Sequence, residues 1–498
     1  MPRALVRVAE VLEGEVTVCM ECAPKLEYGL AVPRFQREHD GCVATAGGPE
    51  RLFLRSRGAA LTIDGSTARS RVRLSAGHSA AWVLHRAPGT YAAAPARLDA
   101  RETLADTTRA WRSWASEHAA YDGLYADRVH LASLVFQGLT YQPTGALVVA
   151  ATTSLPEVAG GDANWDYRYA WLRDAAMTVR ALSASACSDE SRRYFDWMVR
   201  AAVTCQAEDQ VQIVFGVDGE RDLSEHRLEH LAGHLGSRPV RVGNAAWRQK
   251  QLDVLGHVLD SAWTIRDELG GLDDFTARFL RQLADRAAEQ WRERDSSIWE
   301  GREGERHYVV SEVGCWVALD RAAALADRLG ARDDRRRWAA ERDELRRTVL
   351  REAFDERRGA FTGAFGSDHL DAGVLLLPLL DFIAADDPRM TSTIALLEDE
   401  LADGGLIRRW TGAEDGPFLT ASFWLAECHA RAGRIDRAHE VFEQVAGTAS
   451  DLGLLAEEVD PAGGGLLGNF PQAISHVGLV NAAPALTEAQ SRQGTAAA

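Results

Sequence analysis

The chain has 498 residues, of which 46% are hydrophobic and 26% are charged, and its formal net charge is −17 at pH 7. This composition is typical of a globular protein with room for one large domain and a smaller one. The negative charge would repel nucleic acids and anionic membranes, so we expect neither as a partner.

The cysteines and the apolar runs indicate a cytoplasmic protein. Seven cysteines, an odd number, are scattered along the chain and suggest no disulfide framework. Cys19 and Cys22 have C-x-x-C spacing, but the alternation in "EVTVCMEC" places them on opposite faces of a strand, and no second pair completes a zinc site. The start, "MPRALVRVAEVLEGE", is broken by charges too early for a signal peptide, and "AGVLLLPLL" is too short to cross a bilayer. We expect neither a metal nor another cofactor.

Hydrophobic periodicity divides the chain into a β-rich part and a helical part. Period-two runs such as "VRV", "VTVCM" and "RVRL" predict a β-sandwich-like module over residues 1–105. A linker helix is expected over 106–124, a helical domain over 125–490 and a disordered tail over 491–498. A period of 3.6 predicts helices near 125–140, 171–184, 188–204, 245–268, 271–293, 308–329, 332–352, 367–380, 387–403, 417–432, 434–447 and 470–485.

Short connections between these helices favour a closed arrangement of helical pairs. Single glycines, among them Gly270, Gly330 and Gly433, follow the predicted helix ends. Short links of this kind make neighbouring helices antiparallel. About twelve paired helices fit an α/α toroid; periodicity also permits a solenoid, although no fixed-period repeat favours one. In a toroid the longer connections gather at one end and can form a pocket. These connections are 152–172, 205–244, 294–310, 404–418 and 451–472.

The stretch "GGDANWDYRYAWLRDAAM", residues 160–177, combines aromatic rings with paired charges. Aromatic faces stack on the apolar faces of pyranose rings, and Arg or Asp side chains bind sugar hydroxyls. Trp165, Tyr169, Trp171, Arg173 and Asp174 are therefore candidate sugar-binding residues. An interface helix with ordinary surface salt bridges would have the same composition.

Two acidic positions lie in predicted inter-helix loops. Glu300 follows Trp299, and a carboxyl beside a large apolar ring is poorly solvated, which raises its pKa toward that of a general acid. Glu457, Glu458 and Asp460 form a cluster in a glycine-rich loop. A solvated glutamate and a solvated acidic turn are the alternative interpretations.

Three histidines in "HRLEHLAGHLGSRPVRVGNAA" recur every four residues, at His226, His230 and His234. Gly233 interrupts any helix there, and no carboxylate stands at a ligand spacing, so structural or rim histidines are favoured over a metal site. Arg238 and Arg241, beside Gly and Pro, are candidate hydroxyl donors at a pocket rim.

Taken in order, seven segments resemble glycoside hydrolase family 15, the glucoamylase and trehalase-like enzymes, from the start of the chain to about residue 485. They are "NWDYRYAWLRDAAMTVRAL", "GSRPVRVGNAAWRQKQLDVLGHVLD", "IWEGREGERHYVVSEVGCWVALDRA", "LDAGVLLLPLLDFIAADDPRMTSTI", "GLIRRW", "FLTASFWLAE" and "AEEVDPAGGGLLGNFPQAISHVGLVNAA". The ending and the β-module are more similar to bacterial trehalase-like members than to secreted starch-degrading ones.

The resemblance implies a mainly α fold, an (α/α)₆ barrel behind an N-terminal β-sandwich, and an inverting exo-acting α-glucosidase. It makes Glu300 the general acid and Glu457 the general base, with two carboxyls about 6.5–9.5 Å apart around a water molecule. The substrate-binding residues that follow from the motifs and the resemblance are Trp165, Tyr169, Trp171, Arg173, Asp174, Arg238, Arg241, Trp299, Arg409 and Trp410.

The sequence departs from the family's pattern in several places. Relatives usually have an additional N-terminal portion, so the β-module is expected to be shortened. "RRW" replaces the usual "RY", His257 stands where relatives usually have Glu, and His234 where Tyr is common.

The leading hypothesis is hydrolysis of terminal α-linked glucose from trehalose or short α-glucans. The alternatives are a glucoamylase or glucodextranase acting on longer α-glucans, a phosphorylase, which would need an anion site in place of a base, and a non-catalytic carbohydrate-binding or regulatory relative. The expected partner is a small carbohydrate, and the sequence leaves a homo-oligomer open.

Overall fold

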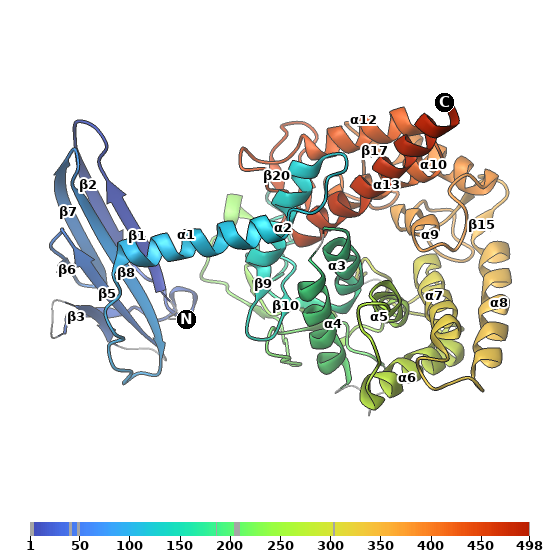
Figure 1. The fold of residues 1–498 in the computed structure, drawn as a ribbon, viewed down its shortest axis with the longest axis horizontal. Helices are drawn as coiled ribbons and strands as arrows, with labels where there is room; N and C mark the ends of the chain where they lie inside the picture. The colour runs from blue at the N-terminus through green and yellow to red at the C-terminus, as the bar shows by residue number, and fades with distance from the viewer. Residues whose placement is uncertain are drawn as a thin grey trace. The chain divides into compact units, whose positions relative to one another are not determined.

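The computed structural model describes residues 4–38, 42–46, 50–185, 187–203, 210–301 and 304–497. Cys205 and the first part of the predicted 205–244 connection lie outside these ranges. The chain divides into two compact units, Met1–Glu117 and His118–Ala498 (Figure 1).

The first unit is a sandwich of two antiparallel sheets. One sheet has the strand order β1 (Ala4–Glu10), β8 (Ser79–Pro88), β5 (Glu50–Arg57), β4 (Val43–Ala46) and β3 (Arg34–Arg37). The other has the order β2 (Glu15–Cys22), β7 (Thr67–Ser75) and β6 (Thr62–Asp64). Their inner faces share one core, in which the Trp82 indole donates a hydrogen bond of 2.9 Å to the Ser70 hydroxyl. The alternation predicted for β2 is confirmed, because Cys19 is exposed while Cys22 packs against this core.

Helix α1 (Ala100–Glu117) belongs to the same unit and contacts β1 and β8. It begins earlier than the linker helix expected over 106–124. The Asp99 side chain accepts the amide hydrogens of Arg101 and Glu102, and this N-cap fixes where the helix starts.

The second unit is a double ring of helices, so the mainly α fold expected from the sequence is confirmed. The inner helices are α3 (Leu172–Ala184), α5 (Asp253–Thr264), α7 (Val309–Leu325), the short α9 (Leu376–Leu379), α11 (Leu419–Arg431) and α13 (Ala473–Ala497). The outer helices are α2 (Ala126–Leu139), α4 (Ser188–Val203), α6 (Asp274–Gln290), α8 (Arg335–Glu352), α10 (Pro388–Glu400) and α12 (Ile435–Ala446). Each inner helix contacts the next, and α13 contacts α3, which closes the ring and excludes an open solenoid.

Burial separates the two rings. Almost every residue of the inner helix α7 is buried, whereas the outer helix α12 buries one face, as a surface helix does. The inner helices approach closely, since a Cβ atom on Gly256 of α5 would lie 2.1 Å from the Gly314 carbonyl oxygen of α7. Glycine is therefore required at this crossing.

The structure differs from the predicted helices in three places. The helix expected near 367–380 is a 3₁₀ turn, η5 (Ala372–Leu375), followed by the one-turn α9, which ends before Asp381 with its left-handed φ of 61°. The helix expected over 245–268 is split into η4 (Ala245–Arg248) and α5. Where a disordered tail was expected over 491–498, α13 continues to Ala497, because this stretch is rich in helix formers such as Ala, Gln and Arg.

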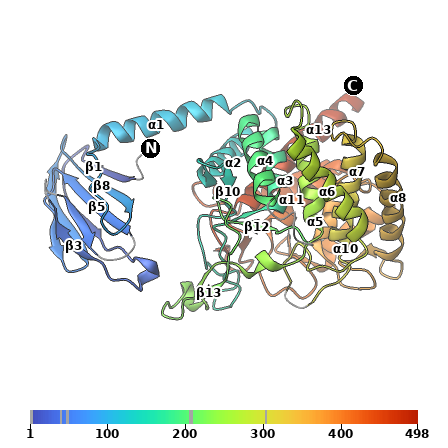
Figure 2. The ribbon, with the colours of Figure 1, turned by 90° about the horizontal axis from the view of Figure 1, so that it is seen from below.

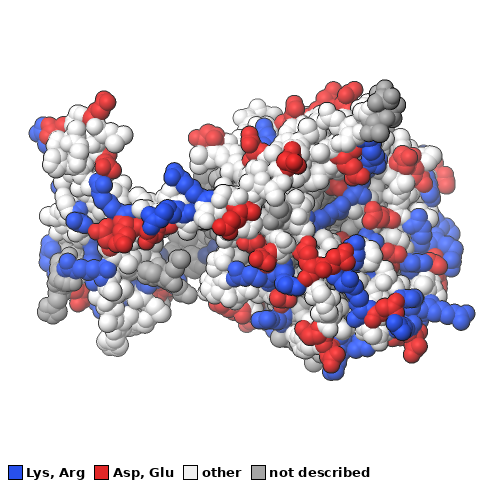
Figure 3. All heavy atoms as spheres, in the orientation of Figure 1, with Lys and Arg blue, Asp and Glu red and all other residues white. Residues whose placement is uncertain are grey.

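On the face in Figure 3, acidic and basic side chains are interspersed over the helical unit. No helix in the described part of the chain is long and apolar enough to cross a membrane.

The connections that precede the inner helices gather at one end of the barrel. They contain short antiparallel strand pairs. β11 (Ala170–Trp171), before α3, pairs with β12 (Val214–Phe215), which follows α4, and β13 (His226–Arg227) pairs with β14 (Arg241–Val242) before α5. In Figure 2, β13 lies at the lower end of the helical unit.

Candidate active site

A cavity of about 850 Å³ opens at this end of the barrel. Its walls come mainly from the connections that precede α3, α5, α7, α11 and α13, together with side chains from the first turns of α3 and α11. Nine of the residues predicted from the sequence line it: Trp165, Trp171, Arg173, Asp174, Trp299, Glu300, Arg409, Trp410 and Glu457.

Glu300 is held in a strained turn at the cavity wall. Its φ is 58°, a left-handed conformation that is uncommon outside glycine and costs energy. The Trp171 indole donates a hydrogen bond of 2.6 Å to its Oε1 atom, and the Arg173 guanidinium lies 3.5 Å away. Burial raises the pKa of Glu300, while Arg173 and the indole act in the opposite direction. The turn thus presents a carboxyl that holds a proton more tightly than a solvated glutamate.

Arg173 and Asp174 project from the first turn of α3. The Arg173 guanidinium donates to Asp174 Oδ1 (3.2 Å), to Gln251 Oε1 (3.1 Å) and to the Ile298 carbonyl (2.8 Å). Burial raises the pKa of Asp174, although the arginine opposes that change. This pair offers a fixed donor and an acceptor at the cavity wall.

Glu457 lies in the loop before α13. Its Oε1 atom accepts hydrogen bonds from the Tyr167 hydroxyl (3.1 Å) and from Arg409 (3.0 Å). Its Oε2 atom is buried and has no hydrogen-bond partner among the described residues. Burial and the nearby Glu157 carboxylate raise the pKa of Glu457, and Arg409 and Tyr167 lower it.

A close backbone approach sets the position of Glu457. Gly468 has a φ of 77°, and a Cβ atom there would lie 2.9 Å from the Cβ atom and from Oε2 of Glu457. Only glycine leaves room for the carboxylate in this conformation.

Arg409 is the hub of a buried carboxylate cluster. Its guanidinium pairs with Glu157 (3.1 Å), Glu457 (3.0 Å), Glu458 (2.8 Å) and Asp415. It also stacks over the Phe418 ring, 4.6 Å from the centroid. One cation therefore faces four carboxyl groups. Burial disfavours the charge of the guanidinium, but the four carboxylates favour it more strongly, so the pKa of Arg409 is raised.

The two adjacent glutamates have different surroundings. Glu457 lines the cavity, whereas Glu458 begins β19 (Glu458–Val459), is fully buried and accepts the Gly416 amide hydrogen at 3.1 Å. Of the two side chains, only that of Glu457 is part of the cavity wall. Glu458 is nevertheless not solvated, because its carboxylate pairs with the same Nη2 atom of Arg409 that Glu457 contacts.

Trp299 belongs to an aromatic wall. Its indole donates a 2.8 Å hydrogen bond to Asp371 Oδ1, and its ring lies against Trp410, Phe418 and Trp424. Burial raises the pKa of Asp371 to about 6. Aromatic faces beside charged groups form the combination that sugar rings bind.

Three predicted binding residues are not among those that line the cavity. Arg241 is buried; its guanidinium donates to the carbonyls of Asp162 (2.6 Å) and Asn164 (3.1 Å) and stacks on Trp165 at 4.5 Å, so it holds a wall residue in place. Arg238 is exposed and donates to the Leu231 carbonyl at 3.1 Å. Tyr169 is half-buried, and its carbonyl accepts the Val149 amide hydrogen at 3.0 Å.

The three spaced histidines do not share a helix. His226 lies in β13 and His234 in η3 (His234–Gly236), and all three are exposed. A group that could hold a metal in the cavity region, Glu157, Asp415 and Glu458, surrounds the Arg409 guanidinium, which takes the place of a cation.

Sequence reasoning missed three residues of the site, namely Tyr167, Glu157 and Asp415. Tyr167 lies within the stretch singled out for its aromatic and charged residues, but nothing in its spacing identified it as a partner of Glu457. Glu157 and Asp415 lie in irregular loops, where periodicity gives no indication of side-chain direction.

A double ring of helices with two buried carboxyls and aromatic rings around one cavity is an arrangement suited to hydrolysing glycosides. The family model for glycosyl hydrolases family 15 matches residues 129–484, and the chain belongs to this family. It is a glycoside hydrolase.

Relatives with known names agree with this assignment. The chain is 35% identical to a trehalase of Mycolicibacterium smegmatis over 505 residues, covering 96% of this chain and 73% of that protein. It is 37% identical to a trehalase of Thermoplasma volcanium over 392 residues, covering 78% of this chain and 62% of that protein. A bacterial glucoamylase solved in complex with acarbose has the same fold, with a TM-score of 0.75 at 14% identity, covering 98% of this chain and 82% of that one.

Proposed function

We propose that this protein is an inverting, exo-acting α-glucosidase that releases terminal glucose from trehalose or short α-glucans. The observation that carries the proposal is that Glu300 and Glu457 line one cavity in different surroundings, one in a turn beside Trp171 and the other beside Arg409. Two carboxyls with separate environments are what acid and base roles require.

In this mechanism Glu300 protonates the glycosidic oxygen. Burial raises its pKa, which favours the protonated form that a general acid needs, and the Trp171 indole stabilises the carboxylate left after proton transfer. The left-handed turn directs the carboxyl into the cavity at a cost in backbone energy, which is a common property of functional positions.

Glu457 activates the water that attacks the anomeric carbon. Tyr167 and Arg409 hold one oxygen, and the other oxygen, which has no hydrogen-bond partner among the described residues, can accept the proton of that water. Arg173 and Asp174 hold the terminal glucose through charge-assisted hydrogen bonds, while Trp299 and Trp410 stack on the sugars.

The relatives named as trehalases support trehalose as the substrate. Hydrolysis of longer α-glucans is the second candidate, supported by the glucoamylase with the same fold. We also infer a reducing compartment such as the cytoplasm, because the cysteines in the described part of the chain are free thiols.

Glucose release from trehalose, maltose and isomaltose, with and without phosphate, tests the activity and the substrate. We expect release from trehalose without any need for phosphate as the acceptor, and glucose rather than glucose phosphate as the product. Glu300→Gln should lower kcat by roughly 10²–10⁴-fold with the fold intact. Glucose phosphate as the product would indicate a phosphorylase, and no release from any of the three sugars would favour the binding or regulatory alternative.

Proton NMR of the fresh product tests inversion and the base. An inverting enzyme must release β-glucose first from an α-glucoside, and α-glucose before mutarotation would overturn the mechanism. Glu457→Ala should abolish hydrolysis, and azide should restore some turnover from the vacated space. Glu458→Gln is the matched control, because it keeps an oxygen for the Gly416 amide and should retain most activity.

A further inference from the structure

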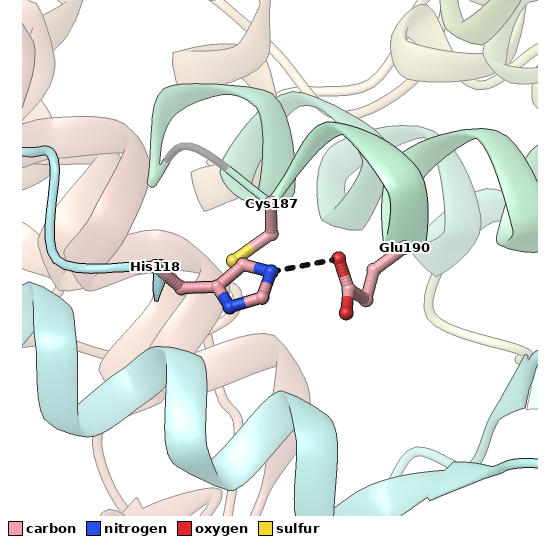
Figure 4. A group of neighbouring side chains, drawn as sticks. All are labelled: His118, Cys187 and Glu190. Carbon is pink, nitrogen blue, oxygen red and sulfur yellow. Dashed lines mark ion pairs between the residues drawn. The ribbon is translucent and has the colours of Figure 1, made fainter. Parts of the chain in front are cut away.

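Outside the cavity, three side chains with three kinds of ligand atom lie together in the helical unit. His118 stands just after the end of α1, and Glu190 lies in the first turn of α4. Cys187 precedes α4, and its backbone carbonyl accepts the Ser191 amide hydrogen at 3.0 Å. One ligand atom from each lies within 4.8 Å of the other two, and the side chains point toward one another (Figure 4).

The spacing suits a small metal ion. Zn²⁺ binds sulfur at about 2.3 Å and nitrogen or oxygen at about 2.0–2.2 Å in a tetrahedron, which separates neighbouring ligand atoms by roughly 3.3–3.6 Å. His118 Nε2 lies 3.3 Å from Glu190 Oε2, within that range. The remaining separations are at most 4.8 Å, so a shift of about 1 Å by each side chain would complete the geometry.

Charge and access also fit. A thiolate and a carboxylate together balance a divalent cation, and imidazole adds no charge, so the occupied site would be neutral in a poorly solvated environment. The side chains of His118 and Glu190 are each 15% exposed, which gives an ion a path to the buried sulfur.

We propose that His118 Nε2, Cys187 Sγ and a carboxylate oxygen of Glu190 bind one Zn²⁺ ion, with water as the fourth ligand. The ion would join the segment before α2 to the start of α4. It would thus close a long loop of chain between His118 and Cys187. Such a closure stabilises the folded chain, because the ligands are not assembled in the unfolded state. The site is separate from the residues proposed for hydrolysis.

Cobalt provides a spectroscopic test on the full-length protein. The metal-free, reduced protein is titrated with Co²⁺, and a thiolate ligand produces a near-ultraviolet charge-transfer band that oxygen ligands do not. We expect a band that saturates at about one Co²⁺ per chain, is lost on addition of Zn²⁺ and is absent in Cys187→Ser. The double variant Cys19→Ser/Cys22→Ser, which removes the C-x-x-C pair of the β-sandwich, should retain the band.

Two further variants keep the test decisive if Cys187→Ser fails to fold. His118→Asn and Glu190→Gln change partly exposed side chains, and each should weaken Co²⁺ binding by about tenfold or more, since each removes one of three ligands. Zn²⁺ should raise the Tm of the unmodified protein, and the same Zn²⁺ concentration should raise the Tm of these variants by less. Absence of the band, or a band that persists in all three variants, would leave only a His118–Glu190 ion pair beside an inert thiol and would overturn the proposal.

Discussion

Replacing Arg409 with Met should destabilise the helical unit, and the loss of stability should be larger at high pH than at low pH. Arg409 is the cation shared by Glu157, Asp415, Glu457 and Glu458, all of them buried. Methionine fills much of the same volume but leaves these carboxyls without their counter-charge. Removing one partner of a buried ion pair costs about 3–5 kcal/mol, a large share of the roughly 5–15 kcal/mol that stabilises a typical domain.

The sign of the pH dependence follows from the pKa shifts. Burial already raises the pKa of Glu457 and Glu458 above the unfolded value of about 4.3, and Arg409 is a charge that lowers both. Without the arginine these pKa values rise further, so the folded state binds more protons than the unfolded state. Stability then falls as pH rises, and the loss should be smaller at pH 5 than at pH 8.

Urea unfolding at pH 5, 6.5 and 8, followed by circular dichroism, measures this effect. Arg408→Met is the matched control, since Arg408 pairs with the single carboxylate of Asp403 and with backbone carbonyls. It should lose stability without a comparable pH dependence. A loss for Arg409→Met below about 1 kcal/mol, or one that is the same at all three pH values, would refute this account of the cluster.

Three further predictions concern single residues of the barrel. Glu157→Gln removes the charge that, after burial, most raises the pKa of Glu457. The acidic limb of the pH profile of kcat/KM should therefore move to lower pH. An unmoved limb would contradict either the assignment of Glu457 as the base or the electrostatic coupling between Glu157 and Glu457. Gly468→Ala places a methyl group against Glu457 and should lower kcat by roughly tenfold or more, measured on trehalose, and an unchanged kcat would mean that the loop yields without moving the carboxylate. Burial raises the pKa of Glu312 to about 9, so the free energy of unfolding should fall as the pH rises from about 4.5 to 9. Glu312→Gln should flatten this fall, and at pH 8 its free energy of unfolding, measured with urea, should exceed that of the parent by on the order of 1 kcal/mol. Equal urea midpoints at pH 8 would argue against a buried neutral carboxyl.

The sequence predicted the helical elements well where an apolar face repeats. The helix expected over 434–447 is α12 (Ile435–Ala446), and the one expected over 188–204 is α4 (Ser188–Val203). It predicted α9 poorly, because residues 373–380 are apolar on every side and contain Pro378, so periodicity gives no length. Closure of the ring also could not be derived from local pattern, since it depends on the contact between α13 and α3.

Within the site, the sequence located the motifs but not the direction of each side chain. Arg241 and Arg409 are both arginines in predicted loops, yet one supports the back of Trp165 and the other holds four carboxyls beside the cavity. Whether an arginine lies behind the cavity wall or beside the cavity depends on the path of an irregular backbone. That path is set by packing against other loops. The hydrogen bond between Tyr167 and Glu457 joins segments that are far apart in the sequence, so no single stretch of sequence predicts it.

The order in which the cavity walls occur along the chain has a consequence for biosynthesis. The first wall residues precede α3, whereas Glu457 and the glycine that makes room for it come just before α13, the helix that completes the inner ring. A nascent chain that has not yet emerged as far as α13 therefore has neither the carboxylate that we propose activates water nor a closed wall around it. Fragments left by premature termination would be inert toward sugars, and synthesis would produce activity only at its final step.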